Sequence, residues 1–312
     1  MKAIDNGRRR ARALFALAVW LAASVWLLVA GTASAAEPLR VCADPNNLPY
    51  SDKSGAGFEN ALAELVSTAL GDDGVSYTWR PQRRGFVRNT LGAHLCDVIM
   101  GVPLGYELAA TTKPYYYSTY VFVTRTGGGL SISTIDDPAL RKLRIGVPAV
   151  GDDYASTPGE AALGKRGIID NVVAYSIYGD YSKPHPPSNL IEAVAAGDID
   201  VAIAWGPLAG YFASREAVPL TVTPVSPHVD PPFPFVFGIA MGVRHGDDVL
   251  RERLNSVIAA HAADIHRLLE QYAIPLVDAS VARQVQASLA PRVSFSAARP
   301  AAEGSEKSGQ TE

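Results

Sequence analysis

Short runs of β-branched and aromatic residues alternate with helical stretches along most of this 312-residue chain. Such alternation is typical of parallel strands joined by crossover helices, so it predicts an α/β fold. A first series of elements is expected at residues 39–44 (strand), 58–70 (helix), 75–79 (strand), 87–93 (helix), 97–101 (strand) and 120–125 (extended segment). A glycine-rich break at 127–129 ends this series.

A second series is expected at residues 143–147 (strand), 158–165 (helix), about 172 (strand), 187–196 (helix), 200–204 (strand) and 207–214 (helix). The run 224–234 is dense in proline and cannot hold an interior strand or helix, so we expect it to return the chain to the first series. The elements expected after this return are a strand at 235–243 and helices at 247–272 and 279–289.

The N-terminus has the order of a secretory signal. Basic residues from Arg8 to Arg12 precede an apolar run at 13–30, and small residues end at Ala35. We expect residues 1–36 to be removed on export, which places the protein in the periplasm. The alternative is a retained membrane anchor, because an apolar run of about 18 residues is just long enough to span a bilayer.

About 276 residues remain after such cleavage, a length at which one core usually divides into two. We expect a first lobe made of residues 37–124 and 232–292, and a second lobe made of residues 125–231. The final residues, 293–312, are expected to form a disordered tail.

The charge of the mature chain excludes two classes of partner. The whole sequence holds 28 basic and 31 acidic residues, and removal of the signal takes away five basic and one acidic, leaving 23 against 30, or −7. Nucleic acids and anionic membranes are bound mainly through clustered lysine and arginine, so neither is expected as a partner.

Cys42 and Cys96 are the only cysteines. In an exported chain two cysteines are expected to pair as a disulfide, and the alternative is a pair of small buried residues on neighbouring strands. No metal site is expected, because two thiolates without a histidine cluster are too few for a closed zinc site.

Four unusual strings carry a resemblance to a known family: VCADPNNLP at 41–49, WRPQRRGFVRNT at 79–90, YSIYGDY at 175–181 and AWGPLAGY at 204–211. With them, from about residue 39 to 278, the chain resembles the type II periplasmic binding proteins, two α/β lobes joined by two crossing hinge segments. Within that superfamily it is similar to the MxaJ/XoxJ-type proteins associated with PQQ-dependent methanol dehydrogenases.

The resemblance implies a periplasmic accessory that assists maturation or activity of a PQQ-dependent methanol dehydrogenase, with the lanthanide-type enzyme favoured. Its partner would be that dehydrogenase, with the dehydrogenase's cytochrome c as a further candidate. No enzyme activity and no cofactor of its own are expected, since the sequence has no nucleophile, metal or dinucleotide motif. The alternative is the solute receptor of an ABC transporter for a small ligand other than an amino acid.

Strand ends locate the inter-lobe cleft, because ligands of open α/β sheets bind beyond the carboxyl ends of the strands. Amino-acid receptors of the resembled superfamily carry an arginine after the third strand and an aspartate after the last strand of the second lobe. Here the stretch 102–109 has no arginine, and Trp205 stands in place of the aspartate. A zwitterion would be desolvated unpaired, at a cost of several kcal/mol. Amino-acid uptake is therefore excluded.

The candidate cleft residues fall into three groups. Aromatic candidates for a ligand or partner are Tyr50, Tyr106, Tyr178, Trp205 and Tyr211, although about half of such residues are expected to pack within the lobes. The basic candidates are Arg80, Arg83 and Arg84, which suit carboxylates of a cofactor such as PQQ or of an acidic partner; the alternative is a solvated helix start. Asp44 and Asn46 offer oxygens to a hard cation, but a turn closed by their side chains is favoured.

Overall fold

The computed structural model describes residues 36–149, 156–177 and 185–289. Most of the expected signal, Tyr178 and the expected tail 293–312 lie outside these ranges. The strands are β1 (Leu39–Ala43), β2 (Asn46–Asn47), β3 (Ser51–Asp52), β4 (Val75–Trp79), β5 (Val98–Pro103), β6 (Ala110–Thr111), β7 (Tyr116–Arg125), β8 (Ile145–Ala149), β9 (Val172–Ser176), β10 (Val201–Trp205), β11 (Leu220–Pro224), β12 (Val229–Asp230), β13 (Phe233–Pro234) and β14 (Val236–Val243).

The helices are α2 (Phe58–Leu70), α3 (Phe86–Asn89), α4 (Pro158–Lys165), α5 (Asn189–Ala196), α6 (Gly206–Ala213), α7 (Asp248–Ala260), α8 (Ala262–Gln271) and α9 (Ala279–Leu289), with short 3-10 turns η1 (Pro138–Arg141) and η2 (Pro186–Ser188). Among the described residues no helix has both the length and the apolar character of a membrane span.

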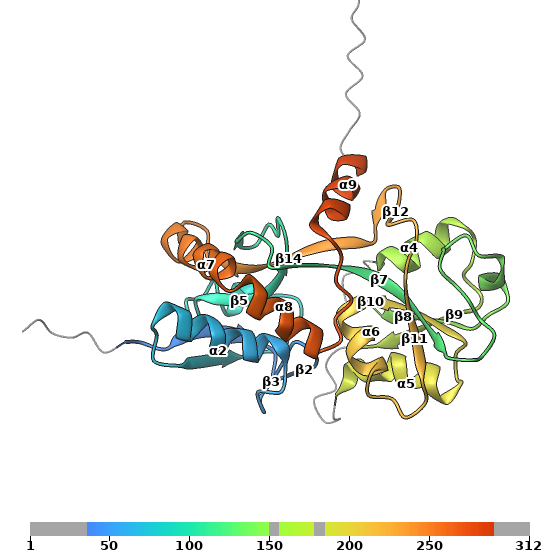
Figure 1. Ribbon diagram of the computed structural model, residues 1–312, viewed down its shortest axis with the longest axis horizontal. Coiled ribbons are helices and arrows are strands. Elements are labelled where there is room, and N and C mark those ends of the chain that lie inside the picture. The colour runs from blue at the N-terminus through green and yellow to red at the C-terminus, as the bar shows by residue number, and fades with distance from the viewer. Residues whose placement is uncertain (1–35, 150–155, 178–184, 290–312) are drawn as a thin grey trace, which may run out of the picture.

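Two α/β lobes lie side by side, joined by long strands (Figure 1). The sheet order is β4-β1-β5-β14-β7-β10-β8-β9. The outer strands β4, β1 and β5 are parallel to one another in one lobe, as are β10, β8 and β9 in the other. The predicted type II architecture is confirmed.

Strands β7 and β14 form the crossing between the lobes. The first part of β7, Tyr116–Thr119, pairs antiparallel with β14, whereas Tyr120 to Thr124 pair with β10 of the second lobe. The partner of β7 thus changes after Thr119, a few residues before residue 124, where the sequence places the lobe boundary. The lobe limits themselves stay a prediction.

The first lobe packs α2, α7 and α8 against one face of its sheet. Phe58 and Leu62 of α2 are fully buried, as is Met241 of β14. The helix expected at 247–272 is instead two helices, because the chain leaves helical geometry at His261, with φ −110° and ψ 21°. This break allows both α7 and α8 to place their apolar residues in the same core.

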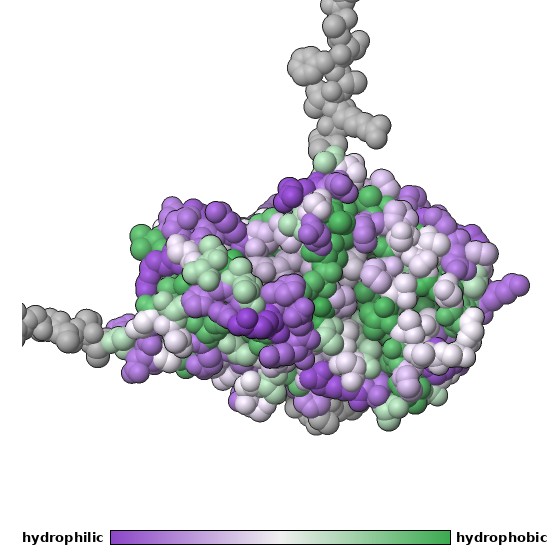
Figure 2. All heavy atoms as spheres, viewed as in Figure 1, coloured by the Kyte–Doolittle hydropathy of each residue, from purple (hydrophilic) through white to green (hydrophobic). Residues whose placement is uncertain are grey.

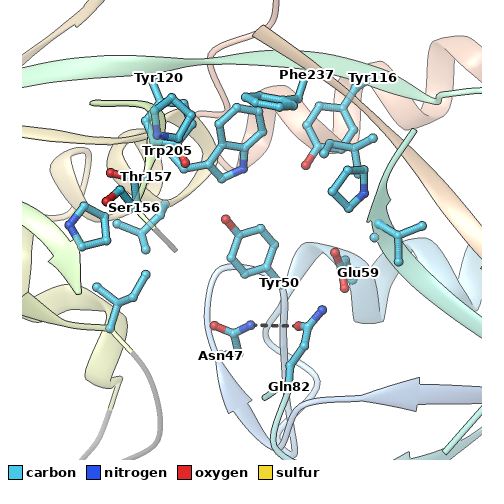
Figure 3. A pocket seen from close by; sticks show the side chains of 18 residues that line it. Asn47, Tyr50, Glu59, Gln82, Tyr116, Tyr120, Ser156, Thr157, Trp205 and Phe237 are labelled. Atoms are coloured by element: carbon cyan, nitrogen blue, oxygen red, sulfur yellow. Dashed lines mark hydrogen bonds between the residues drawn. The ribbon is translucent and has the colours of Figure 1, made fainter. Parts of the chain in front are cut away.

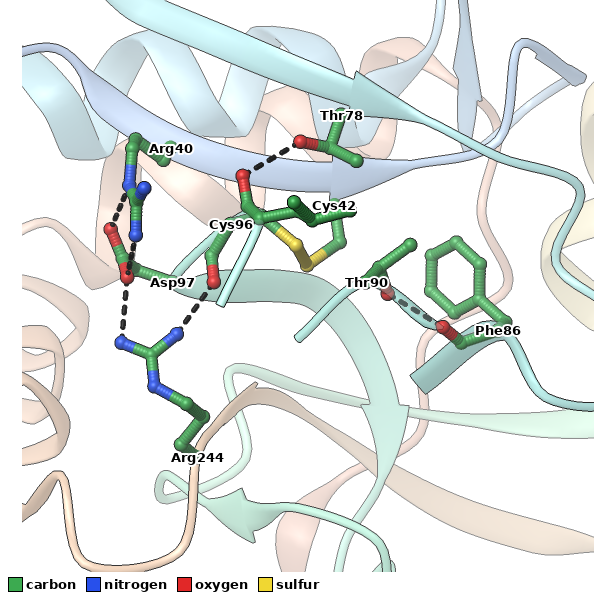
Figure 4. The surroundings of a disulfide bond; sticks show 9 residues. Arg40, Cys42, Thr78, Phe86, Thr90, Cys96, Asp97 and Arg244 are labelled. Carbon is green, nitrogen blue, oxygen red and sulfur yellow. Dashed lines mark hydrogen bonds and ion pairs between the residues drawn. A yellow bond between two sulfur atoms is a disulfide. The ribbon is translucent and has the colours of Figure 1, made fainter. Parts of the chain in front are cut away.

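The disulfide lies on the opposite face of that sheet (Figure 4). Cys42 of β1 and Cys96, just before β5, are bonded, with Cα atoms 5.4 Å apart. The predicted pairing is confirmed. Beside it, Arg40 Nε and Arg244 Nη2 each donate to the Asp97 carboxylate over 2.7 Å. The Arg40 hydrogen bond, followed by that from Arg244, holds the pKa of Asp97 below its ordinary value. The ionised carboxylate of Asp97 therefore links Arg40 of β1 to Arg244, the residue after β14.

The second lobe has a core on each side of its sheet. Helices α5 and α6 cover one side, where Leu190, Ile191 and Ala209 are buried, and α4 covers the other with Leu163. Strand β11, which the sequence did not predict, adds to the edge of β7. Beyond the end of β11 at Pro224 and a bridge from Ser226 to Thr134, the proline-dense run forms the two-residue pair of β12 and β13, and the chain then returns to the first lobe as expected.

The segment between α8 and α9 passes over the junction of the lobes. Figure 2 shows hydrophobic residues gathered along this middle strip of the visible face. Ile274 in this segment is buried, Val277 N donates to Tyr117 O of β7, and α9 then packs against Val236 of β14. The C-terminal part of the fold therefore braces the crossing strands from outside.

Candidate functional site

A cavity of about 440 Å³ lies between the lobes. Both lobes and both crossing strands contribute side chains to it (Figure 3). Its described lining residues are Asn47, Tyr50, Glu59, Gln82, Gly101, Val102, Pro103, Tyr116, Tyr120, Pro148, Ser156, Thr157, Pro158, Ile177, Trp205, Leu208, Phe237 and Ile239. Most of this surface is apolar or aromatic, so the cavity suits an organic group better than a bare ion.

Three aromatic rings form one wall of the cavity. Trp205 ends β10, and its ring lies 5.5 Å from that of Tyr120 and 5.8 Å from that of Phe237, centroid to centroid. All three pairs are tilted or edge-on, with interplanar angles of 57° to 76°. Because Tyr120 and Phe237 lie on the crossing strands, the wall stands where the lobes meet. Its rings are half-buried, leaving their remaining surface to the cavity.

Glu59 lies on the first-lobe side of the cavity, in the first turn of α2. Its carboxylate packs against the backbone of β5, since a Cβ on Gly101 would lie 2.0 Å from Glu59 Oε1. Desolvation by burial raises the pKa of Glu59 to about 8. The titratable groups around it are phenols, namely Tyr77, Tyr115 and Tyr116, and the nearby carboxylate in turn helps to raise their pKa values.

The segment from Asp44 to Tyr50 forms the base of the cavity. Asp44 is buried, and its carboxylate accepts from Asn46 N over 2.9 Å and from Gln82 N over 2.6 Å. Asn47 Nδ2 donates to Gln82 Oε1 over 3.3 Å. Asp44 thus holds two loops together, in the turn chemistry that the sequence favoured, while Asn47 and Gln82 present their amides to the cavity.

The predicted site residues do not all converge. Tyr50 and Trp205 line the cavity, whereas Asp44 and Asn46 support its base without lining it. Tyr106 packs over the buried cluster that contains the disulfide.

The remaining candidates lie on the surface or within the second lobe. Arg80, Arg83 and Arg84 are exposed on the loop that carries the lining residue Gln82. Tyr211 is buried in α6. Whether these residues bind a ligand or a partner stays a prediction.

Comparison with known proteins places the chain in a family. Residues 102–263 match the family described as bacterial extracellular solute-binding protein. Protein MoxJ of Methylorubrum extorquens is 31% identical over 303 residues, which cover 88% of this chain and 98% of MoxJ. The chain is a MoxJ-type extracellular solute-binding protein.

Two crystal structures of related proteins share this fold. The periplasmic binding protein XoxJ from Methylobacterium extorquens is 35% identical with a TM-score of 0.63, over 77% of this chain and 99% of that chain. MxaJ from Methlophaga aminisulfidivorans is 26% identical with a TM-score of 0.64, over 77% of this chain and 100% of that chain. The resemblance read from the sequence is therefore confirmed.

This MoxJ-type protein has lobes that are also joined outside the crossing strands. Leu48, from the loop between β2 and β3, is buried in the core of the second lobe beside α5 and α6. On α6, a Cβ at Gly210 would lie 2.1 Å from Ala273 O, so this helix meets the segment after α8 at backbone distance. These contacts hold the lobes together around the cavity.

Sequence reasoning missed several lining residues of the MoxJ-type cavity. Glu59 and Phe237 were not candidates, and neither were Tyr116 and Tyr120. They escape the strand-end rule because Glu59 is on a helix and the others lie within crossing strands. The predicted two-lobed fold could have pointed to the residues on the crossing strands. These strands must pass behind the cleft, so alternate side chains along them face the cavity.

Proposed function

We propose that this protein is a periplasmic accessory of a PQQ-dependent methanol dehydrogenase, which binds and does not catalyse. The observation that carries the proposal is the likeness to MoxJ along nearly its whole length. The MxaJ/XoxJ-type proteins that the sequence resembles are associated with such dehydrogenases. The N-terminal pattern of a secretory signal supports export to the periplasm.

The chemistry of the cleft agrees with a role other than amino-acid uptake. The described lining residues include neither arginine nor aspartate, and Trp205 occupies the end of β10. A free amino acid would find no bidentate cation for its carboxylate, and charge burial without such a partner is costly.

The exposed arginine loop is the surface that we assign to the dehydrogenase. Arg80, Arg83 and Arg84 are adjacent on one loop of a protein whose mature net charge is negative, so they suit an acidic patch on a partner. We further propose that the partner is of the lanthanide type and that the contact assists its maturation or activity. Identity with XoxJ, 35%, above that with MxaJ, 26%, supports this choice.

A pull-down from periplasm with the mature protein, read by mass spectrometry, tests the association. We expect the dehydrogenase in the eluate, and light scattering of the two purified proteins should detect a complex that weakens as salt rises. The variant Arg80→Glu should weaken the complex, whereas Arg283→Glu, the same charge change at an exposed position on α9, should leave it intact. A transporter permease in the eluate in place of the dehydrogenase would contradict the proposal.

A further inference from the structure

The cavity between the lobes has a distribution of charge that points to one class of ligand. Among the described residues that line it, Glu59 is the only formally charged side chain, and none is lysine, arginine or histidine. An anionic ligand would therefore meet a carboxylate and no cation. The ligand of this cavity is therefore expected to be neutral or positively charged.

The environment of Glu59 favours the cation. Within the described residues its carboxyl group accepts no hydrogen bond and forms no ion pair, although Glu59 is partly buried beside the cavity. Gly101 gives it backbone contact without a donor, and its titratable neighbours are the phenols of Tyr77, Tyr115 and Tyr116. Burial disfavours the ionised form of this carboxyl, and an incoming cation would favour it by supplying the partner that it lacks.

The opposite wall of the cavity supplies what an organic cation needs beyond one carboxylate. Trp205, Tyr120 and Phe237 contact one another through tilted edges, so each leaves part of a ring surface to the space between the lobes. Figure 3 shows these rings and Glu59 around the same space, with Tyr50 between them. Aromatic faces attract ammonium groups and also pack against apolar carbon, and tryptophan is the most effective of them.

We propose that this cavity binds a small organic ammonium ion, with its nitrogen beside Glu59 and its apolar body against Trp205, Tyr120 and Phe237. A volume of about 440 Å³ admits an ion with an aromatic ring or several methyl groups. The inference does not depend on the dehydrogenase, because it concerns the cavity alone.

The test is calorimetric titration of the mature protein with three probes of one shape: 2-phenylethylammonium, 2-phenylethanol and phenylacetate. They carry a positive charge, no charge and a negative charge. We expect the ammonium probe to bind about tenfold more tightly than the alcohol, and phenylacetate to bind more weakly than either.

Variants locate the preference. Glu59→Gln should abolish the advantage of the ammonium probe over the alcohol, whereas Glu64→Gln, the same charge change on the exposed face of α2, should preserve it. Trp205→Ala should weaken both probes. Gly101→Ala changes the position of the Glu59 carboxyl group without removing it, because the added Cβ forces Glu59 Oε1 to move. The advantage of the ammonium probe over the alcohol should then fall.

Four results would overturn the proposal. They are equal affinity for the three probes, tighter binding of phenylacetate, an ammonium preference that survives Glu59→Gln, and absence of saturable binding of 2-phenylethylammonium. None of these outcomes bears on capture of the dehydrogenase, which is measured separately, so failure of the two proposals can be told apart.

Discussion

The ring of Tyr211, on α6 of the second lobe, stacks on the ring of Tyr272, at the end of α8 in the first lobe, with centroids 5.8 Å apart and planes at 16°. The guanidinium carbon of Arg215 lies over the ring of Tyr211, 3.6 Å from its centroid. Tyr272 also meets the buried ring of Phe58 edge-on at 5.9 Å, and its Oη donates to Ala56 O over 2.9 Å. The rings of Phe58, Tyr272 and Tyr211 thus form an aromatic chain that connects the first lobe to α6 of the second.

Removing one ring of this chain should loosen the lobes. For Tyr272→Leu we expect an increase in the radius of gyration by small-angle scattering, because an inter-lobe stack worth about 1 kcal/mol beyond its burial is lost. Tyr77→Leu is the control, since Tyr77 stacks on Trp79 within one strand of the first lobe. An unchanged scattering curve for Tyr272→Leu would mean that the other contacts between the lobes set their arrangement without this stack.

A methyl group at Gly210 should separate α6 from the segment after α8. Alanine there places a Cβ 2.1 Å from the backbone oxygen of Ala273, so we expect Gly210→Ala to lower the free energy of unfolding by about 1–3 kcal/mol. Gly164→Ala is the matched control, because Gly164 is also helical but has open space around its Cβ position. That variant should gain about 0.5–1 kcal/mol from helix propensity. Urea denaturation of both variants measures the difference.

Loss of the disulfide should destabilise the first lobe. Cys42 and Cys96 close a loop with a sequence separation of 54, for which the chain-entropy model gives about 4 kcal/mol. We expect Cys42→Ala and Cys96→Ala to lower the midpoint of denaturant unfolding by similar amounts, and the double variant to add little to either. Reduction of the wild-type protein should reproduce the loss, whereas it should not change either variant.

Glu59 should make the stability of the protein depend on pH near neutrality. Its folded pKa of about 8 lies above the ordinary value of 4.5, so the folded state holds a proton that the unfolded state releases. The favourable contribution is complete below pH 4.5, is lost as pH rises, and is gone above 8. Glu59→Gln removes this dependence and should be the more stable protein at pH 7, by about 3 kcal/mol in the limiting case.

Thermal unfolding of both proteins from pH 4 to 9 measures this effect. The gap between Glu59→Gln and wild type should widen between pH 4.5 and 8 and then become constant. A gap of constant size over the whole range would show that folding does not raise the pKa of Glu59.

The local pattern of the sequence determined most elements of this fold. Helices at 58–70, 158–165 and 279–289 were expected at the bounds that the structure has, because their apolar spacing, first-turn prolines and terminal glycine act within a few residues of the backbone. The pairing of Cys42 with Cys96 also followed from cysteine number and export. These features depend on neighbours in sequence or on chemistry that needs no coordinates.

Most of the cavity's lining was decided only by the tertiary structure. Trp205 was predictable as a lining residue because it ends a strand, but Glu59, Tyr120 and Phe237 come from a helix and from two crossing strands that meet only when the lobes assemble. Likewise, sequence periodicity cannot reveal that β7 pairs with a strand of each lobe or that Leu48 enters the other lobe. Burial and charge at these positions are properties of distant segments packed together, so no local pattern carries them.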